Sequence, residues 1–432
     1  MKSEVKIHWL QIDFLLLFSV LLLIVIGAAV VFSASSFKAD NLMQQRLQKK
    51  AVAAEKAGDM EKAAKLAAKA KTVDGSAYYI KKQAGKIFVG LLLMMLVASV
   101  PYERWLGLSP LFLLASIFLL ALLFTPLPIV VSRDEASRWL NLFGFTFQPS
   151  DFARYALLLF LARFLYEMRE MLSDWRAFLM LLGVAFVVIG LIAVEKDLGT
   201  AAMVTLTVFV MFWFAGVKSG FLFLTGMSFF ALALIYLQLN HYMIQRMITF
   251  IGPLFGHGEP SFQIQQSLIS FALGGAVGVG IGNSVQKYEF LPEAYKDMVF
   301  SILGEELGFI GTVGVLLLFA LIMYRGIRIA RSAPNEYGRL LAGGITACIM
   351  LYTVINVAVA LALLPTTGIP MPFISYGGSA LISHLIGIGL LLNISARGSD
   401  SNHRYETGET YRSRVKTMPF FGTSRMNNFR RR

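Results

Sequence analysis

Residues 286–311, QKYEFLPEAYKDMVFSILGEELGFIG, lead from a charged loop with a proline straight into an apolar helix. Asp297 therefore lies where water meets a membrane. On a helix that continues from Asp297, three small residues share roughly its face, namely Ser301, Gly304 and Gly308. The stretch 297–325 can include a half-helix. This part of the chain thus predicts an acid at the mouth of a membrane span, with a groove of small residues beside it.

The composition is that of a membrane protein. Of the 432 residues, 56% are hydrophobic and only 15% are charged, and the mean hydropathy is +0.66. One soluble core cannot bury so much apolar surface. A helical crossing needs roughly 20 apolar residues, and counting such runs predicts an all-α polytopic protein with about ten transmembrane helices. Their approximate centres are Leu23, Leu93, Ile117, Leu159, Val187, Val208, Leu232, Leu316, Tyr352 and Gly387.

Lysine and arginine predict the orientation, because positive charge accumulates on the cytoplasmic side of short loops. With an even number of spans, the basic groups share the side of both termini: Arg163, Arg169 and Arg176; Arg325, Arg328, Arg331 and Arg339; and the tail from Arg397 onward. Both termini are therefore expected to be cytoplasmic. The base-poor segments 125–150 and 239–296 lie outside, the second as a large extracytoplasmic loop between helices 7 and 8. The net charge of +13 indicates orientation and contact with anionic membrane lipids, not nucleic-acid binding.

One polar segment interrupts the spans. Residues 40–74 are rich in Ala and Lys, favour helix and are too polar for the bilayer. By parity they form an extracytoplasmic insertion, which Gly58 and Asp59 divide into two short helices of a solvent-exposed hairpin. The hairpin is either a solvated insertion without a catalytic role or a docking site for a partner. Residues 1–398 form a single transmembrane domain, and residues 399–432 are expected to be a basic, disordered cytoplasmic tail.

The residues alone leave two interpretations of Asp297 open. A charge at the mouth of a span is costly and is therefore a candidate functional group. A carboxylate is also favoured at the start of a helix by the dipole and the free N–H groups, so Asp297 can equally be a cap. Two acids lie deeper in the same helix, Glu305 about 80° away and Glu306 on the opposite side. For these, an ion pair with a neighbouring span is the favoured interpretation.

A second group of charges surrounds the start of the span near Leu159. Asp151 and Arg154 are three residues apart on one helical face and can pair with each other. A guanidinium also fits a phosphate, so Arg138 and Arg154 are candidates to hold a diphosphate at the outer membrane surface. The self-neutralising pair and the phosphate site both remain open for Arg154.

Several common site types are excluded. The single cysteine, Cys348, supports neither a disulfide framework nor a cysteine metal site. The five histidines show no metal-ligand spacing, and no Ser-His-Asp pattern is present, so hydrolase and zinc-enzyme readings are unsupported. The glycines of 274–282 are not a phosphate loop, because no strand precedes them and no Lys-Ser/Thr follows; they permit close backbone approach or a re-entrant bend. Three prolines within 365–372 predict a shaped outer turn.

Three stretches resemble a known family. LPEAYKDMVFSILGEELGFIG at 291–311, LLPTTGIPMPFISYGGSAL at 363–381 and RWLNLFGFTFQPSDFAR at 138–154 are similar to signatures of the SEDS proteins, the RodA/FtsW/SpoVE group of bacterial peptidoglycan polymerases. The resemblance covers roughly residues 10–395. It implies a ten-helix glycosyltransferase in the cytoplasmic membrane that joins lipid II units at the outer face. It also implies that Asp297 is the catalytic residue. GEELGFIG and LLPTTGIP are closer to the FtsW division branch than to the RodA elongation branch.

The implied reaction is an inverting glycosyl transfer between two polyprenyl-linked sugars, in which Asp297 serves as general base on the acceptor hydroxyl. Cationic side chains or a divalent cation, Mg²⁺ or Mn²⁺, must stabilise the departing diphosphate; no organic cofactor is expected. The candidate substrate-binding residues are Arg138, Asp151, Arg154, Lys287, Glu305 and Arg246. For Lys287, a solvated loop position is an equal alternative. The implied partners are lipid II, a class B penicillin-binding protein and other division proteins at the septum.

The chain departs from the family pattern in two places near these residues. Tyr295 and Lys296 precede Asp297 where relatives usually have His and Thr, and Asp151 and Arg154 replace Glu and Lys while keeping their charge. Elsewhere, Lys196 stands where a proline is common, and the insertion at 40–74 is not typical of the family; neither of these two departures removes a catalytic group. The alternatives to a division polymerase are a lipid II flippase, the elongation polymerase of the RodA branch, and a scaffold that only recruits the transpeptidase.

Overall fold

The computed structural model describes residues 12–56, 59–72, 76–133, 136–142, 145–288, 291 and 294–405. Most of them are helical. The helices are α1 (Phe14–Lys56), α2 (Met60–Thr72), α3 (Ser76–Ser99), α4 (Tyr102–Leu122), α5 (Pro149–Glu167), α6 (Trp175–Val194), α7 (Leu198–Phe214), α8 (Ser219–Leu239), α9 (His241–Leu254), α10 (Phe262–Gly274), α11 (Val299–Arg331), α12 (Glu336–Ala360) and α13 (Gly378–Tyr405), with a 3-10 turn, η2 (Arg169–Met171). Most of the predicted basic tail, residues 406–432, lies outside the described residues.

All ten predicted span centres lie within helices, so the polytopic helical fold is confirmed. Eight helices of the described chain are long and apolar enough to cross a membrane, and α7 is a shorter apolar helix. Their outer faces carry large apolar side chains, as on α4, where Leu114 and Phe118 are each 65% exposed. A surface of this kind is suited to lipid rather than water.

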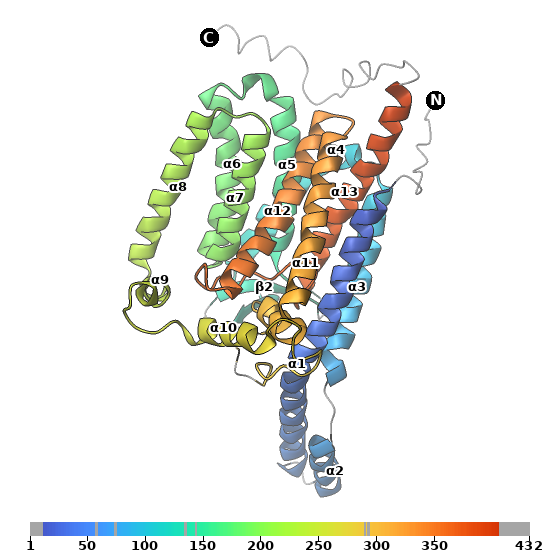
Figure 1. Ribbon diagram of the computed structural model, residues 1–432, viewed down its shortest axis with the longest axis vertical. Coiled ribbons are helices and arrows are strands. Elements are labelled where there is room, and N and C mark those ends of the chain that lie inside the picture. Colours follow the sequence, from blue (N-terminus) through green and yellow to red (C-terminus); the bar gives the residue numbers. More distant parts are fainter. Residues whose placement is uncertain are drawn as a thin grey trace.

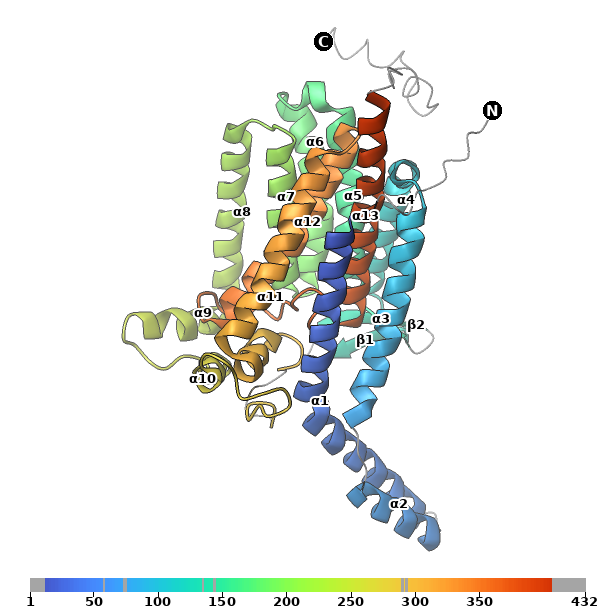
Figure 2. The ribbon, with the colours of Figure 1, turned by 45° about the vertical axis from the view of Figure 1, so that its right-hand side comes forward.

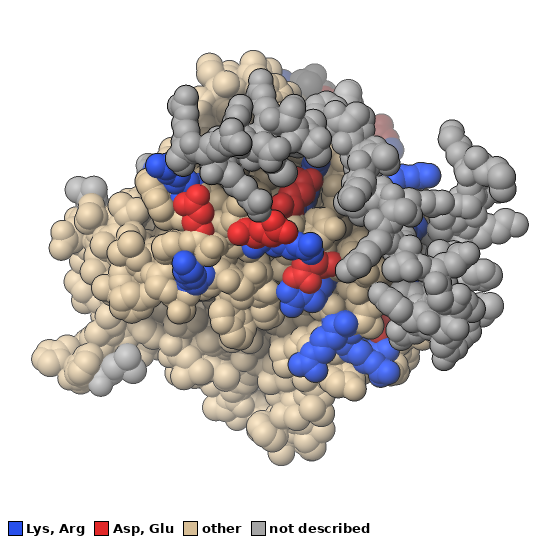
Figure 3. Space-filling view, turned by 90° about the horizontal axis from the view of Figure 1, so that it is seen from above, with Lys and Arg blue, Asp and Glu red and all other residues tan. Residues whose placement is uncertain are grey.

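The helices form an elongated bundle with two distinct ends (Figures 1 and 2). The start of α1 and the end of α13 lie at one end, whereas α2, α9, α10 and the strands lie toward the other. The end that holds the start of α1 carries both basic and acidic side chains (Figure 3). Ion pairs join the helix ends here: Arg325 Nη2 lies 2.7 Å from Asp13 Oδ2, and Arg397 Nη1 lies 2.5 Å from Glu103 Oε1. This is the end that the sequence predicts to be cytoplasmic.

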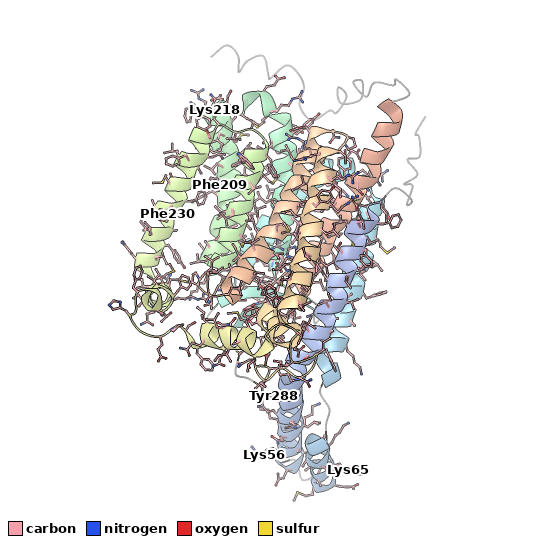
Figure 4. The ribbon with its side chains drawn as sticks, in the orientation of Figure 1. Lys56, Lys65, Phe209, Lys218, Phe230 and Tyr288 are labelled. Carbon is pink, nitrogen blue, oxygen red and sulfur yellow. The ribbon has the colours of Figure 1, made fainter. Side chains whose placement is uncertain are left out.

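The described residues of the segment 40–74, namely 40–56 and 59–72, project from the opposite end as a helical hairpin, and the predicted divider Gly58 lies outside them. Its first helix is not separate, because α1 runs without interruption from the bundle to Lys56, and α2 packs back along it (Figure 2). Ala51 and Ala54 are buried between the two helices. Lys56 and Lys65 point outward from the hairpin (Figure 4). Small alanines between the helices and lysines outside explain why an Ala- and Lys-rich sequence forms this hairpin.

The outer segment between α4 and α5 contains a small sheet that the sequence analysis did not predict. It is antiparallel, in the order β1 (Val130–Arg133), β2 (Ala136–Leu142) and β3 (Phe145–Phe147). Leu140 of β2 pairs with Val130 on one side and Phe147 on the other. Strands of three to seven residues give too short a periodic pattern to be recognised in a loop.

The predicted half-helix is present in α11. Its backbone leaves helical geometry at Gly308, with φ 65° and ψ −166°, so a short helix from Val299 precedes the long one that ends at Arg331. Only glycine adopts this φ/ψ combination readily. The break places the first helical turns after Asp297 at the same end of the bundle as α9 and α10 (Figure 1).

Candidate active site

Asp297 lies in the turn that immediately precedes α11, and its side chain is half-buried. The N-cap position of α11 belongs to Met298, and no side chain there makes a capping hydrogen bond. Asp297 thus lies one residue before the N-cap, and not at the N-cap itself. The catalytic role of Asp297 stays a prediction.

One side chain of α12 holds the backbone of Asp297. Asn356 Nδ2 donates hydrogen bonds to the carbonyl oxygens of Asp297 and Ile369, each at 2.8 Å. Asn356 is 1% exposed, and a buried amide that satisfies two backbone acceptors is costly to remove. Asn356 thereby fastens the turn of Asp297 to the turn that contains Ile369.

The proline-rich segment 365–372 forms the predicted shaped turn, and it faces Asp297. Gly368 has φ +72°, and a Cβ atom there would lie 3.5 Å from Asp297 Oδ2. Arg246 of α9 donates from Nε to Thr366 Oγ1 at 2.9 Å. The structure therefore brings the guanidinium of Arg246 to the turn that borders the carboxylate.

The glycine-rich segment 274–282 packs its backbone directly on α11. A Cβ at Gly274 would lie 2.0 Å from the Gly304 carbonyl oxygen, and one at Gly278 would lie 2.2 Å from that of Glu306. The amides of Val279 and Gly280 donate to the carbonyls of Glu305 and Glu306, each at 3.0 Å. The predicted close backbone approach is thus observed, and it supports the broken part of α11.

Glu305 and Glu306 hold this segment, not a neighbouring cation. Glu305 accepts from Ser284 Oγ at 2.5 Å and from the Val285 amide at 2.7 Å. Glu306 accepts from the Gly282 amide at 3.1 Å and from the hydroxyl of Ser33. Both acids are fully buried, and neither forms a salt bridge within the part of the chain that the structure describes. The predicted ion pair is therefore wrong, because two loop amides, the Ser284 hydroxyl and the hydroxyl of Ser33 in α1 take the place of a cation. The direct substrate contact predicted for Glu305 remains a proposal that its burial does not favour.

Lys287 belongs to the same loop. Its backbone amide donates a hydrogen bond to Ser284 Oγ at 3.3 Å, and its ammonium donates to the Gly282 carbonyl oxygen. Its neighbour Tyr288 lies at the end of the molecule opposite to Lys218 (Figure 4). Lys287 is thus at the end of the bundle opposite to the start of α1, and Glu305 positions the loop that carries it.

Arg138 of β2 ties the sheet to the turn between α6 and α7. It donates from Nε to the Glu195 carbonyl at 3.2 Å and from Nη2 to the Lys196 carbonyl at 2.5 Å. Burial, together with the negative charge of Asp197, raises the pKa of the Glu195 carboxyl to about 8, although Arg138 opposes the shift. Glu195 is therefore mostly protonated at neutral pH. Arg138 lies near the outer surface, but its donors are directed to backbone oxygens.

Asp151 and Arg154 form the predicted pair, with Arg154 Nη2 3.5 Å from Asp151 Oδ1. Arg154 also donates to Ser383 Oγ at 3.0 Å, and its guanidinium lies 4.3 Å from the centroid of the Tyr352 ring. Arg154 is only 1% exposed. This burial favours the self-neutralising pair over contact with a phosphate at the membrane surface.

Comparison with known proteins places this arrangement in a family. Residues 60–400 match the model of the FtsW/RodA/SpoVE family, described as "Cell cycle protein". The chain belongs to this family. This SEDS chain is 35% identical to Stage V sporulation protein E of Bacillus subtilis, with 89% of this chain and 96% of that protein covered. It is 37% identical to a probable peptidoglycan glycosyltransferase FtsW of Geobacter sp., covering 74% of this chain and 87% of that one.

The fold of this SEDS chain is also similar to that seen in a solved structure. It is reported as "Structural coordination of polymerization and crosslinking by a peptidoglycan synthase complex", and one of its chains superposes with a TM-score of 0.68 at 28% identity. The match covers 90% of this chain and 99% of that one. The predicted family, with its likeness to FtsW, is confirmed.

The described residues of this SEDS chain form no dedicated metal cage. Within the described ranges, no three His, Cys, Asp or Glu side chains converge as metal ligands. Mg²⁺ is commonly held by one or two carboxylates together with substrate phosphates and water, so the predicted divalent cation stays a prediction. No step below is assigned to a metal, and the cationic side chains are considered in its place.

Two residues near Asp297 were not identified from the sequence of this SEDS chain. Asn356 is the only amide side chain of α12, and a buried polar residue in a span is a signal that could have been used. Lys86 of α3 lies 4.2 Å from the centroid of the Tyr376 ring, where Tyr376 donates from its amide to the Tyr295 carbonyl at 2.9 Å. A lysine in a short apolar span was an available signal as well.

Replacing Asn356 with alanine is expected to lower kcat by about 10- to 100-fold, because the turn that carries Asp297 loses its fixed position. The matched control is Thr353→Ala. Thr353 is also buried, one turn earlier on α12, but its hydroxyl donates only within the helix, to the Ile349 carbonyl at 3.0 Å. Steady-state polymerisation kinetics check this, and equal activities of the two variants would contradict the positioning role of Asn356.

Proposed function

We propose that this chain, a peptidoglycan glycosyltransferase of the SEDS family, polymerises lipid II into glycan strands at the outer face of the cytoplasmic membrane. The observation that carries the proposal is the placement of Asp297. The acid is half-buried and immediately precedes α11, whose first turns lie at the end of the bundle opposite to the start of α1, and Asn356 holds its backbone. Membership in a family with FtsW-named glycosyltransferases supports the reaction class.

Asp297 acts as the general base in this mechanism. The 4-hydroxyl of the acceptor sugar attacks the anomeric carbon of the donor, and Asp297 takes the hydroxyl proton. The new bond joins the acceptor oxygen to the anomeric carbon, while the bond from that carbon to the diphosphate breaks. The undecaprenyl diphosphate leaves with the electron pair. General-base assistance of this kind is typically worth about 10²–10⁴ in rate.

The turns around Asp297 orient the reacting groups. The segment 365–372 approaches the carboxylate through Gly368, where a larger residue would enter the space beside Oδ2. Arg246, hydrogen-bonded to Thr366, brings positive charge to the same turn. Lys287 is a second cation at this end of the bundle, on the loop held by Glu305. Preorganised cations are most effective where the negative charge of a leaving group develops.

The partners proposed are a class B penicillin-binding protein and other division proteins at the septum. Relatives named FtsW, and the likeness to a chain of a peptidoglycan synthase complex that coordinates polymerization and crosslinking, support this assembly. Depletion of the protein in cells tests the septal role. Filamentation is the expected result, whereas rounding of the cells would identify the elongation polymerase instead.

A lipid II flippase is the second candidate, because the break of α11 at Gly308 and the buried charges also suit a transporter. Chemistry separates the two functions. The purified protein with its cognate penicillin-binding protein and labelled lipid II is expected to form glycan strands in the presence of moenomycin. Lipid translocation without any polymer would contradict the polymerase and favour the flippase.

A further inference from the structure

Three lysines gather beside the turn of Asp297. Lys82 and Lys86 lie one turn apart on α3, and Lys296 precedes Asp297 in the chain. Lys86 is half-buried, and the charges that act most strongly on its ammonium are the positive charges of Lys82 and Lys296. Residues more than 200 positions apart are therefore brought together by the packing of α3 against the outer turns.

Two tyrosines connect these cations. The Lys86 ammonium lies 4.2 Å from the centroid of Tyr376, and the Lys296 ammonium lies 5.6 Å from that of Tyr295. The two rings contact each other, with centroids 5.6 Å apart. Cation–aromatic contacts of this kind give each ammonium a fixed place on a scaffold that includes the turn of Asp297.

The start of α13 adds positive character at the same place. A Cβ at Gly378, the first residue of α13, would lie 2.8 Å from Lys86 Cε and 3.1 Å from Lys86 Nζ. The N-terminus of a helix carries partial positive charge and free N–H groups. The Lys86 ammonium and this helix N-terminus thus present positive charge and hydrogen-bond donors to one place, as an anion-binding site requires.

The residues first considered for a phosphate are less suited to it. Arg154 is 1% exposed and paired with Asp151, and Arg138 directs its donors to two backbone carbonyls. Lys82 is exposed, and Lys86 and Lys296 are half-buried. The side chains of the three lysines are thus at least partly exposed to solvent, and Lys296 is adjacent in the chain to the candidate general base, Asp297.

We propose that Lys82, Lys86 and Lys296 bind the diphosphate of the lipid-linked donor and hold it beside Asp297. The inference rests on the proposed polymerase function and assigns its diphosphate site. A diphosphate carries more charge than the phosphodiester of a phospholipid, and three cations match it better. As the bond from the anomeric carbon to the diphosphate breaks, the lysines stabilise the oxygen that takes the electron pair.

Kinetics of the full chain with its penicillin-binding protein and lipid II provide the first test. Lys86→Gln is expected to raise KM by about 10- to 100-fold, as for the loss of a hydrogen bond between charged groups. Lys86→Arg keeps the charge and should restore KM to within about threefold of the native value. Lys296→Gln is a second variant on a different element. The control is Lys65→Gln on α2, whose side chain is 74% exposed on the hairpin (Figure 4); it should leave KM unchanged.

Direct binding of undecaprenyl diphosphate, measured by native mass spectrometry in neutral-lipid nanodiscs, is the second test. Native protein should bind it, and Lys86→Gln and Lys296→Gln should weaken binding by about 10-fold or more. Unchanged binding in both variants would overturn the proposal. So would tight binding of phosphatidylglycerol at the same lysines without preference for diphosphate, which would identify a site for anionic lipid. Because binding needs no turnover, an inactive native protein that still binds diphosphate through these lysines would contradict the polymerase but not the site.

Discussion

Asp297→Asn is expected to lower the rate of glycan polymerisation by about 10²–10⁴-fold, because asparagine keeps the size of the side chain but cannot take the proton of the acceptor hydroxyl. The hydrogen bond from Asn356 goes to the backbone carbonyl of Asp297, so the turn should keep its position in the variant. Loss of activity would then report the missing base, not a displaced turn. The measurement is polymer formed from labelled lipid II by the purified complex.

The matched control makes the same chemical change at the other end of the bundle. Asp174 caps α6 by accepting from the Arg176 amide at 3.1 Å, and asparagine caps a helix about as well. Asp174→Asn should therefore polymerise lipid II at the native rate. The free energy of unfolding of Asp297→Asn should also stay within about 1 kcal/mol of the native value, because asparagine keeps the size of aspartate and accepts hydrogen bonds near a helix start about as well. Full activity of Asp297→Asn would refute the general-base role.

Gly278→Ala is expected to destabilise the outer part of the protein by about 2–5 kcal/mol and to abolish most activity. Alanine is strained at φ +81° by about 1–2 kcal/mol. Its Cβ would also lie 2.2 Å from the Glu306 carbonyl oxygen, so the backbone must move, at a further cost of about 1–3 kcal/mol. Movement here separates the glycine-rich segment from α11 and disturbs the helix that follows Asp297.

The Gly282→Ala variant distinguishes backbone strain at positive φ from a steric clash of the added Cβ atom. Gly282 has a similar φ of +89°, but nothing lies within 4 Å of the position of a Cβ atom. Its variant should show only the strain, with a small loss of thermal stability in detergent and activity close to native. Equal stabilities of Gly278→Ala and Gly282→Ala would show that the close packing on α11 does not matter.

The features that the sequence predicted well are those set by local composition. An apolar run of about 20 residues is helical in lipid because a helix makes all its backbone hydrogen bonds within the run itself, and all ten span centres lie in helices. The break in α11 follows from a glycine that allows φ 65° within the predicted half-helix. The hairpin follows from alanines and lysines at helical spacing, although the sequence did not indicate that α1 continues into it without a break.

The prediction for Glu305 and Glu306 failed for a definite reason. Helical periodicity indicates which face of the helix an acid occupies, but it does not indicate which segment of the chain packs against that face. The partners are the end of the glycine-rich segment and the residues that follow it, which come near the carboxylates because the segment packs its backbone on α11, together with Ser33 of α1. Arg154 shows the same limit, since its spacing from Asp151 predicted the pair, while its burial depends on the helices around α5.

The amino-acid pattern was sufficient for the membrane class, the spans and the acid at the bilayer surface, because these follow from the local cost of placing polar or charged groups in hydrocarbon. It was not sufficient for the surroundings of Asp297. Asn356 reaches two backbone carbonyls, and Lys86 meets Tyr376 and the charge of Lys296, from positions far away in the chain. These contacts depend on how whole helices pack against one another. Packing brings together residues that are far apart in the sequence, and no periodic pattern in the sequence indicates such pairs.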